Sequence, residues 1–238
     1  MEKDTLEKIK TRGYWRVTFR PTVFRKDKIS SLQQCREIIQ KAIVELRGWD
    51  YPHYPTHSND HQGIYNGQDY VGSWIDWECY KEVWRIYQSG QFIHYFGMVE
   101  DWYNETSSSS QPRETIKSGS IFEIVHTVFR VTELFEFLAR LIGQQVYKEG
   151  VNVKITLSKT NNRKLTILDP GRTRLWGDYI ARISEIIFEK EYVEQEIKEK
   201  SKDLALDAIV FIFQRFNWNN PPIEVIKSDQ KRLLERKF

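Results

Sequence analysis

Residues 77–99 read WECYKEVWRIYQSGQFIHYFGMV, two runs rich in aromatic and β-branched residues with Ser89 and Gly90 between them. Such residues favour strands, and a Ser-Gly pair between two runs of this kind predicts a β-hairpin. A two-residue turn at this pair places Arg85 opposite His94, where both side chains have aromatic neighbours. The stretch therefore predicts an antiparallel sheet that contains one polar pair.

This predicted pair is a candidate binding site for a protein partner or a small anionic ligand. A buried histidine beside a fixed cation is pushed toward its neutral form, so His94 can accept a proton or bind an anion together with Arg85. Two structural alternatives stay open: both residues lie at the rim of the sheet, or a carboxylate satisfies the arginine. The candidates for that carboxylate are Glu82, Glu100 and Asp76.

The chain before this hairpin predicts a strand and a helix. Apolar and polar residues alternate in 14–24, which predicts a strand that Pro21 ends or places at a sheet edge. Ser30 or Ser31 can cap a helix that continues to about residue 46.

Two long helices are predicted in the second half of the chain. Apolar residues cover most of the circumference of the first, about 118–147, which indicates a central helix with a thin polar strip at Glu123, Thr127 and Arg130. The second, 194–216, is polar at its start and apolar toward its end.

A second hairpin is predicted at 151–168. A three-residue loop at 160–162 pairs Ile155 with Ile167 and keeps the apolar residues on one face, with an Asn in the left-handed conformation. The pattern of 176–188 fits neither a strand nor a helix cleanly.

These elements together predict the α+β class, with a largely antiparallel sheet built from hairpins and packed against two long helices. We expect a single α+β domain over 1–238. The Ser-rich stretch 104–119 predicts a flexible linker between an N-terminal half, 1–103, and a C-terminal half, 120–238.

Composition narrows the possible classes of function. A formal charge of +3, spread over 36 basic and 33 acidic residues, lacks the dense basic surface of a dedicated duplex-binding protein. Cys35 and Cys79 are too far apart for a zinc ribbon or a redox motif, and buried thiols are expected. The sequence contains no run of about 18 apolar residues, so it indicates neither a membrane span nor a membrane partner, and we expect a cytoplasmic protein.

The segment 47–53, RGWDYPH, is the second candidate binding site. Its prolines restrict the backbone, while Trp49 and Tyr51 offer flat apolar faces beside Asp50 and His53. Such a corner suits recognition of a partner or ligand. The alternative is a packed corner in which Trp49 anchors the loop to the core and Asp50 caps a turn.

The same loop continues with further possible metal ligands. His53, His57, Asp60 and His61 lie close enough in sequence to reach one divalent metal ion, although their spacing matches no recognised metal motif. A solvated loop that carries these residues by chance is the alternative.

A basic strand offers a possible nucleic-acid contact. Arg16, Arg20, Arg25 and Lys26 accompany aromatic residues, and such a surface can stack on or clamp a strand of nucleic acid. The alternative is an ordinary solvated edge.

Three motifs carry a family resemblance. They are GYW at 13–15 leading to RP at 20–21, LRGWDYPH at 46–53, and YQSGQF at 87–92. Together they resemble an uncharacterised bacterial domain associated with Schlafen-type proteins that are regarded as nucleic-acid regulators. The resemblance implies regulation or antiviral host defence, carries no specific activity, and leaves His57, Asp60 and His61 outside the pattern.

The leading hypothesis is a non-enzymatic sensing, adaptor or regulatory module that needs no cofactor and binds a protein partner or small anionic ligand. It is favoured because the sequence contains no Walker loop, GxGxxG, HExxH, GxSxG or CxxC motif. The alternative is a nucleic-acid-binding protein or metal-dependent nuclease that uses the loop 53–61. A third option is a structural subunit whose aromatic residues form an interface.

Overall fold

The computed structural model describes residues 2–106 and 116–237, and these ranges contain a seven-stranded sheet in the order β2-β3-β4-β5-β1-β7-β9. Every neighbouring pair in this sheet is antiparallel. Its strands are β1 (Tyr14–Pro21), β2 (Gln62–Asn66), β3 (Tyr70–Trp77), β4 (Tyr80–Tyr87), β5 (Phe92–Gly97), β7 (Val151–Ser158) and β9 (Glu185–Tyr192). A short parallel pair, β6 (Ile121–Glu123) and β8 (Lys164–Thr166), lies outside it.

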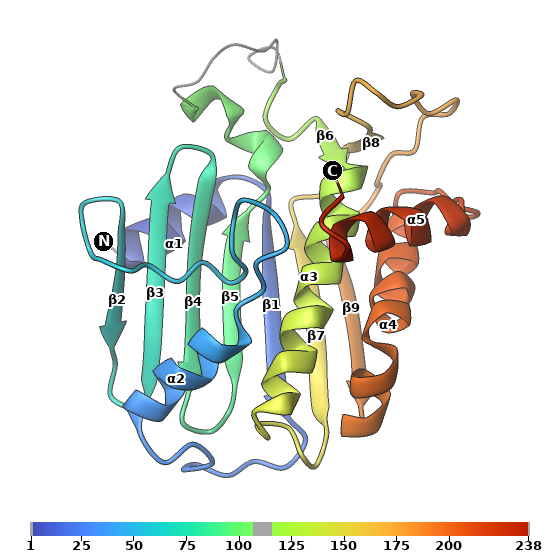
Figure 1. Cartoon of the computed structure of the whole chain (residues 1–238). Helices are drawn as coiled ribbons and strands as arrows, with labels where there is room; N and C mark the ends of the chain where they lie inside the picture. The colour runs from blue at the N-terminus through green and yellow to red at the C-terminus, as the bar shows by residue number, and fades with distance from the viewer. Residues whose placement is uncertain (1, 107–115, 238) are drawn as a thin grey trace.

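Helices lie on both faces of the sheet, and the α+β class is confirmed. Figure 1 shows α2, α3 and α4 on one face, α5 beside α3 and α4, and α1 on the other face. The helices are α1 (Glu2–Thr11), α2 (Leu32–Ala42), α3 (Ile124–Gly143), α4 (Glu194–Arg215) and α5 (Ile223–Leu234), with short 3-10 turns η1 (Val99–Asp101) and η2 (Tyr103–Glu105). None of the helices described combines the length and apolar character that crossing a bilayer requires.

The first strand lies inside the sheet, not at an edge, because β1 pairs with β5 on one side and β7 on the other. Its alternation is as expected: Trp15, Val17 and Phe19 are buried toward α3, and Pro21 is its last residue. Strands from both halves of the chain therefore share one sheet. Of the predicted linker 104–119, residues 107–115 lie outside the described part of the chain.

The long helix α3 is central, as its apolar circumference predicts, since its residues pack against the sheet, α2, α4 and α5. It begins later than expected. Residues 121–123 form β6, and the side chain of Glu123, not a serine, accepts a hydrogen bond from the His126 amide at the helix N-terminus.

The predicted register of the β4–β5 hairpin is wrong by one residue. The turn contains three residues, Gln88 to Gly90, and Gly90 adopts a positive φ of 83°, as a turn that ends in a left-handed glycine requires. Arg85 therefore pairs with Ile93, and His94 pairs with Trp84. Because neighbouring strand residues face opposite sides, this shift places Arg85 and His94 on opposite faces of the sheet.

The predicted second hairpin is also wrong. After β7 the chain leaves the sheet, and β8 pairs in parallel with β6 instead of folding back on β7. The left-handed Asn162 is confirmed, but Lys159 is left-handed too, and buried Arg163 is held by Asp101. Besides β1, the partner of β7 is β9, from the stretch 176–188 whose pattern fits neither element cleanly, because the apolar residues of β9 alternate in step with those of β7.

Candidate functional site

The corner at 44–51 is closed by backbone hydrogen bonds in both directions between Val44 and Tyr51, each 2.9 Å. Asp50 holds the following turn: one carboxylate oxygen accepts from the Tyr54 amide at 3.0 Å, and the other lies 2.7 Å from Nδ1 of His53. The Trp84 indole donates to the carbonyl of His53 at 2.7 Å. The motif RGWDYPH thus forms a rigid corner, and Arg47 and Trp49 project from it.

Trp49 lies within a stack of rings. Its ring centre is 4.4 Å from that of His53 and 4.3 Å from that of Tyr80, with interplanar angles of 20° and 10°. Trp77 continues this aromatic wall at 6.0 Å. Burial opposes protonation of His53, but its hydrogen bonds to Asp50 and Gln62 outweigh burial, and the pKa of His53 is raised above 6.5.

A buried chain of hydrogen bonds joins the corner to the sheet through Glu82. Its Oε1 accepts from the Trp49 indole at 3.2 Å, and its Oε2 lies 3.1 Å from Nε2 of His94. Nδ1 of His94 lies 3.1 Å from the Tyr51 hydroxyl. The consistent proton arrangement has Tyr51 donating to a neutral His94, which donates to an ionised Glu82.

The charges in this chain follow from burial and from Arg130. Burial opposes ionisation of Glu82, yet His94 and Arg130 hold its pKa at about 2. Burial lowers the pKa of His94, with Arg130 adding to that effect and Glu82 opposing it. Burial also raises the pKa of Tyr51 well above 10.

The polar strip predicted on α3 points inward. Glu123, Thr127 and Arg130 are all buried, and His126 lies on the same side of the helix. The Arg130 guanidinium lies 5.0 Å from the ring centre of Phe96, and its side chain is only 3% exposed. Its Nη2 is 4.0 Å from Glu82, and among the residues that the structure describes its Nε has no hydrogen-bond partner.

A second arginine lies beside this strip. Arg47 donates from Nε and Nη2 to the two carboxylate oxygens of Glu133, each at 2.7 Å, and its Nη1 lies 3.5 Å from Nδ1 of His126. Burial, with the positive charges of Arg47 and Arg130, holds the pKa of His126 well below 6.5. The neutral ring therefore accepts from Arg47 and carries its proton on Nε2.

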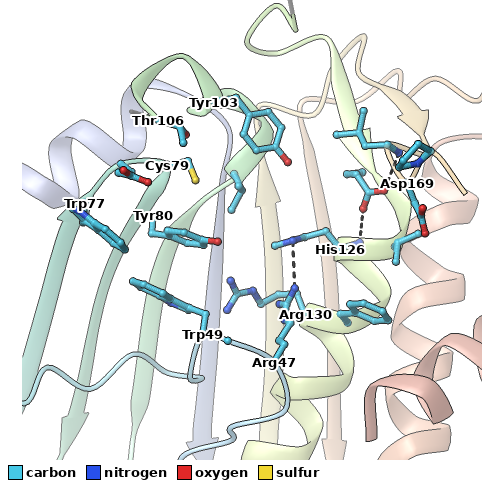
Figure 2. A pocket seen from close by; sticks show the side chains of 18 residues that line it. Arg47, Trp49, Trp77, Cys79, Tyr80, Tyr103, Thr106, His126, Arg130 and Asp169 are labelled. Atoms are coloured by element: carbon cyan, nitrogen blue, oxygen red, sulfur yellow. Dashed lines mark hydrogen bonds between the residues drawn. The ribbon is translucent and has the colours of Figure 1, made fainter. Parts of the chain in front are cut away.

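These residues surround a cavity of about 800 Å³ at one end of the sheet. Figure 2 shows the stack of Trp49 and Tyr80 on one side, the His126 ring opposite, Tyr103 above, and the two arginines below. The lining comes from five separate segments: Arg47, Gly48, Trp49; Trp77, Glu78, Cys79, Tyr80; Val99, Tyr103, Thr106; Glu123, Val125, His126, Phe129, Arg130; and Leu168, Asp169, Pro170.

Of the six predicted binding residues, Trp49 lines the cavity directly. Tyr51 and His94 belong to the buried chain behind it, and Asp50 and His53 hold the corner. Arg85 lies elsewhere: it donates to Glu2 of α1 at 2.9 Å and stacks on Tyr70 at 4.8 Å. The carboxylate that satisfies Arg85 is therefore Glu2, not Glu82, Glu100 or Asp76.

The four predicted metal ligands are not brought together. His53 is engaged by Asp50 and Gln62, whereas His57, Asp60 and His61 are exposed along the loop. Within residues 2–106 and 116–237, no group of three or more His, Cys, Asp or Glu side chains is arranged to hold a metal ion.

The four basic residues come from two elements, the strand β1 and the loop that follows it. Arg16 and Arg20 alternate with the buried residues of β1 and lie on the sheet face away from α3, where Arg20 lies near Glu189 of β9. Arg25 is paired with Glu149 at 2.7 Å, and Lys26 is exposed in the following loop.

Comparison with known proteins finds no matching family model, no similar curated protein and no similar solved structure. The resemblance drawn from the sequence motifs therefore stays a prediction.

Sequence reasoning missed Arg47, Tyr80, His126 and Arg130 as parts of one site. One signal was present: a polar strip on a helix that is otherwise apolar all round must face either solvent or a polar interior. The position of α3 at the centre of the fold decides in favour of the interior.

Proposed function

We propose that this protein is a non-enzymatic sensing or regulatory module that binds a small anionic ligand in the cavity between the Trp49 corner and α3. The observation that carries the proposal is Arg130, a nearly fully buried guanidinium at the cavity with an unpartnered Nε. Burying an incompletely paired cation is costly, and an anion that contacts this guanidinium from the cavity would offset that cost.

The charges around the cavity support this proposal. Arg47 is balanced by Glu133 and Arg130 by Glu82. The lining also includes Glu78, Glu123 and Asp169, of which Asp169 pairs with Arg172 and Glu123 accepts from the His126 amide. His126 is held neutral between the two arginines. An entering anion would meet two guanidinium groups and the Nε2 proton of His126, and it would favour protonation of the ring.

The cavity chemistry suits binding better than catalysis. Burial raises the pKa of Cys79, the thiol on the cavity wall, so this residue stays protonated and is a poor nucleophile. A protein partner that responds to the bound state, and a role in host defence, belong to the same proposal.

Thermal denaturation in inorganic phosphate, with sodium chloride used to hold ionic strength constant, tests the proposal. The melting temperature of the wild-type protein should rise with phosphate concentration. Arg130→Lys keeps the positive charge near Glu82 but removes the planar fork, so the rise should be lost.

Arg140→Lys is the matched control, because Arg140 lies on the same helix, pairs with Glu136 and does not line the cavity. Its response should equal that of the wild type. Equal responses in the wild type and Arg130→Lys would mean that phosphate does not bind at Arg130, and the proposal would be wrong.

A further inference from the structure

We propose that the ligand is a nucleoside monophosphate: a flat base that stacks on the aromatic wall of Trp49, Trp77 and Tyr80, joined by a sugar to a phosphate held by Arg47 and Arg130. This inference rests on the proposed function, since it identifies the class of anion. The proposed function concerns only the anionic group. The inference adds a base, and this part is supported by the aromatic wall and not by the arginines.

The base would bind to the aromatic wall. Tyr80 lies nearly parallel to Trp49, with ring centres 4.3 Å apart, and its own ring is half-buried. Figure 2 shows Tyr80 between Trp49 on one side and the Tyr103–Thr106 segment on the other, with its hydroxyl directed toward His126. A flat base placed against this aromatic wall would extend a stack that already contains His53, Trp49 and Tyr80.

The phosphate would bind to the cationic side. Arg130 brings a buried, incompletely paired guanidinium to the cavity lining, and Arg47 is held in position by two hydrogen bonds to Glu133. The neutral His126 ring, whose Nδ1 lies 3.5 Å from Arg47, lies opposite Tyr80 across the cavity and carries its proton on Nε2. A planar guanidinium with free donors is the preferred partner of a phosphate oxygen.

The size of the cavity links the two halves. A volume of about 800 Å³ lies in the upper part of the range for small-molecule and cofactor sites, roughly 300–1,000 Å³. A lone inorganic anion would fill little of it and would leave the aromatic wall without a partner. The wall comes from the corner and the β3–β4 turn, and the cations come from Arg47 and α3, so a ligand that bridges them must have two chemically different ends.

Isothermal titration calorimetry with AMP, GMP, ribose 5-phosphate, adenosine and inorganic phosphate separates these contributions. Stacking of one base corresponds to about 5- to 150-fold in affinity, so AMP or GMP should bind at least 5-fold more tightly than ribose 5-phosphate. Adenosine should bind more weakly than AMP, because it lacks the phosphate.

Tyr80→Leu should remove most of the advantage of the nucleotide over ribose 5-phosphate while leaving the affinity for ribose 5-phosphate within 2-fold of wild type. Tyr70→Leu is the matched control: it also removes a tyrosine from the β3–β4 hairpin, but Tyr70 does not line the cavity. Its nucleotide affinity should be unchanged.

The outcomes distinguish this inference from the proposed function. If ribose 5-phosphate binds as tightly as both nucleotides, the base is not recognised and this inference is wrong, while the anion site stands. If adenosine binds as tightly as AMP, or if no phosphate compound binds at all, the anion site itself is wrong and both proposals fall.

Discussion

Glu100 provides the sharpest test of the buried electrostatics of the fold, through the substitution Glu100→Gln. Glu100 lies in η1, is 5% exposed, and accepts a hydrogen bond from the Glu123 amide at 3.2 Å. Burial raises the pKa of Glu100 from 4.5 to about 7, with nearby Arg163 opposing the rise. Between pH 4.5 and about 7, Glu100 therefore keeps its proton in the folded protein but has released it in the unfolded chain.

The sign and the size of the effect follow from this difference. Below pH 4.5 both states bind the proton, and Glu100 has no differential effect on stability. Between pH 4.5 and 7 the unfolded state loses its proton first, so stability falls as pH rises. At about 1.4 kcal/mol per pKa unit, the total loss is about 3 kcal/mol and is complete above pH 7.

Glutamine keeps the acceptor for the Glu123 amide and stays neutral at every pH. Glu100→Gln should therefore match the wild type near pH 4.5 and exceed its unfolding free energy by up to about 3 kcal/mol at pH 8. Urea denaturation at pH 5, 6, 7 and 8, with the same slope against denaturant for both proteins, measures the difference. Glu224→Gln, an exposed residue of α5, is the control and should follow the wild type.

The wild type and Glu100→Gln would show parallel stability curves from pH 5 to 8 if Glu100 were ionised in the folded state. That result would refute the assignment of a protonated carboxyl at this position.

Three further predictions concern the cavity and its surroundings. Glu82→Gln leaves Arg130 without a carboxylate, so the unfolding free energy measured by urea denaturation should fall by about 3 kcal/mol at pH 7. The fall should be much smaller near pH 2, because ionised Glu82 stabilises the fold fully above pH 4.5 and no longer does so at about pH 2. Sulfate, whose charge is constant over the range, should bind more tightly as pH is lowered from 7.5 to 5.5, because the anion favours protonation of His126. Calorimetry should show a sulfate affinity that does not change with pH in His126→Gln, and an equal pH dependence in both proteins would contradict this role. Arg85→Ala should leave AMP affinity within 2-fold of wild type, since Arg85 contacts Glu2 and Tyr70 and does not line the cavity; a larger loss by calorimetry would restore Arg85 as a binding residue.

The two hairpins show where sequence reasoning reached its limit. A Ser-Gly pair fits a two-residue turn and a three-residue turn almost equally well, and the choice between them reverses the faces of every later residue. The sequence of β7 offers apolar residues to any strand with the same alternation. Its pairing with β9 instead of β8 depends on contacts such as that of Arg163 with Asp101, 62 positions apart in the chain.

The cavity also depends on contacts between distant parts of the chain. The pattern of α3 predicts a polar strip, and the motif RGWDYPH predicts a rigid corner, but neither indicates that Arg47 and His126 lie together. Arg85 and His94 looked like a pair because they were placed by a local register, whereas the structure gives each a separate partner, Glu2 and Glu82.

The sequence by itself determined the α+β class, the alternation of β1, the central place of α3 and the helix α4, because strand period, helix period and capping depend on residues within a few positions of one another. The tertiary structure alone decided the register of the first hairpin, the partner of β7 and the meeting of five segments at the cavity. These features depend on burial and on charge pairs between residues far apart in the chain, and such contacts form only in the folded protein.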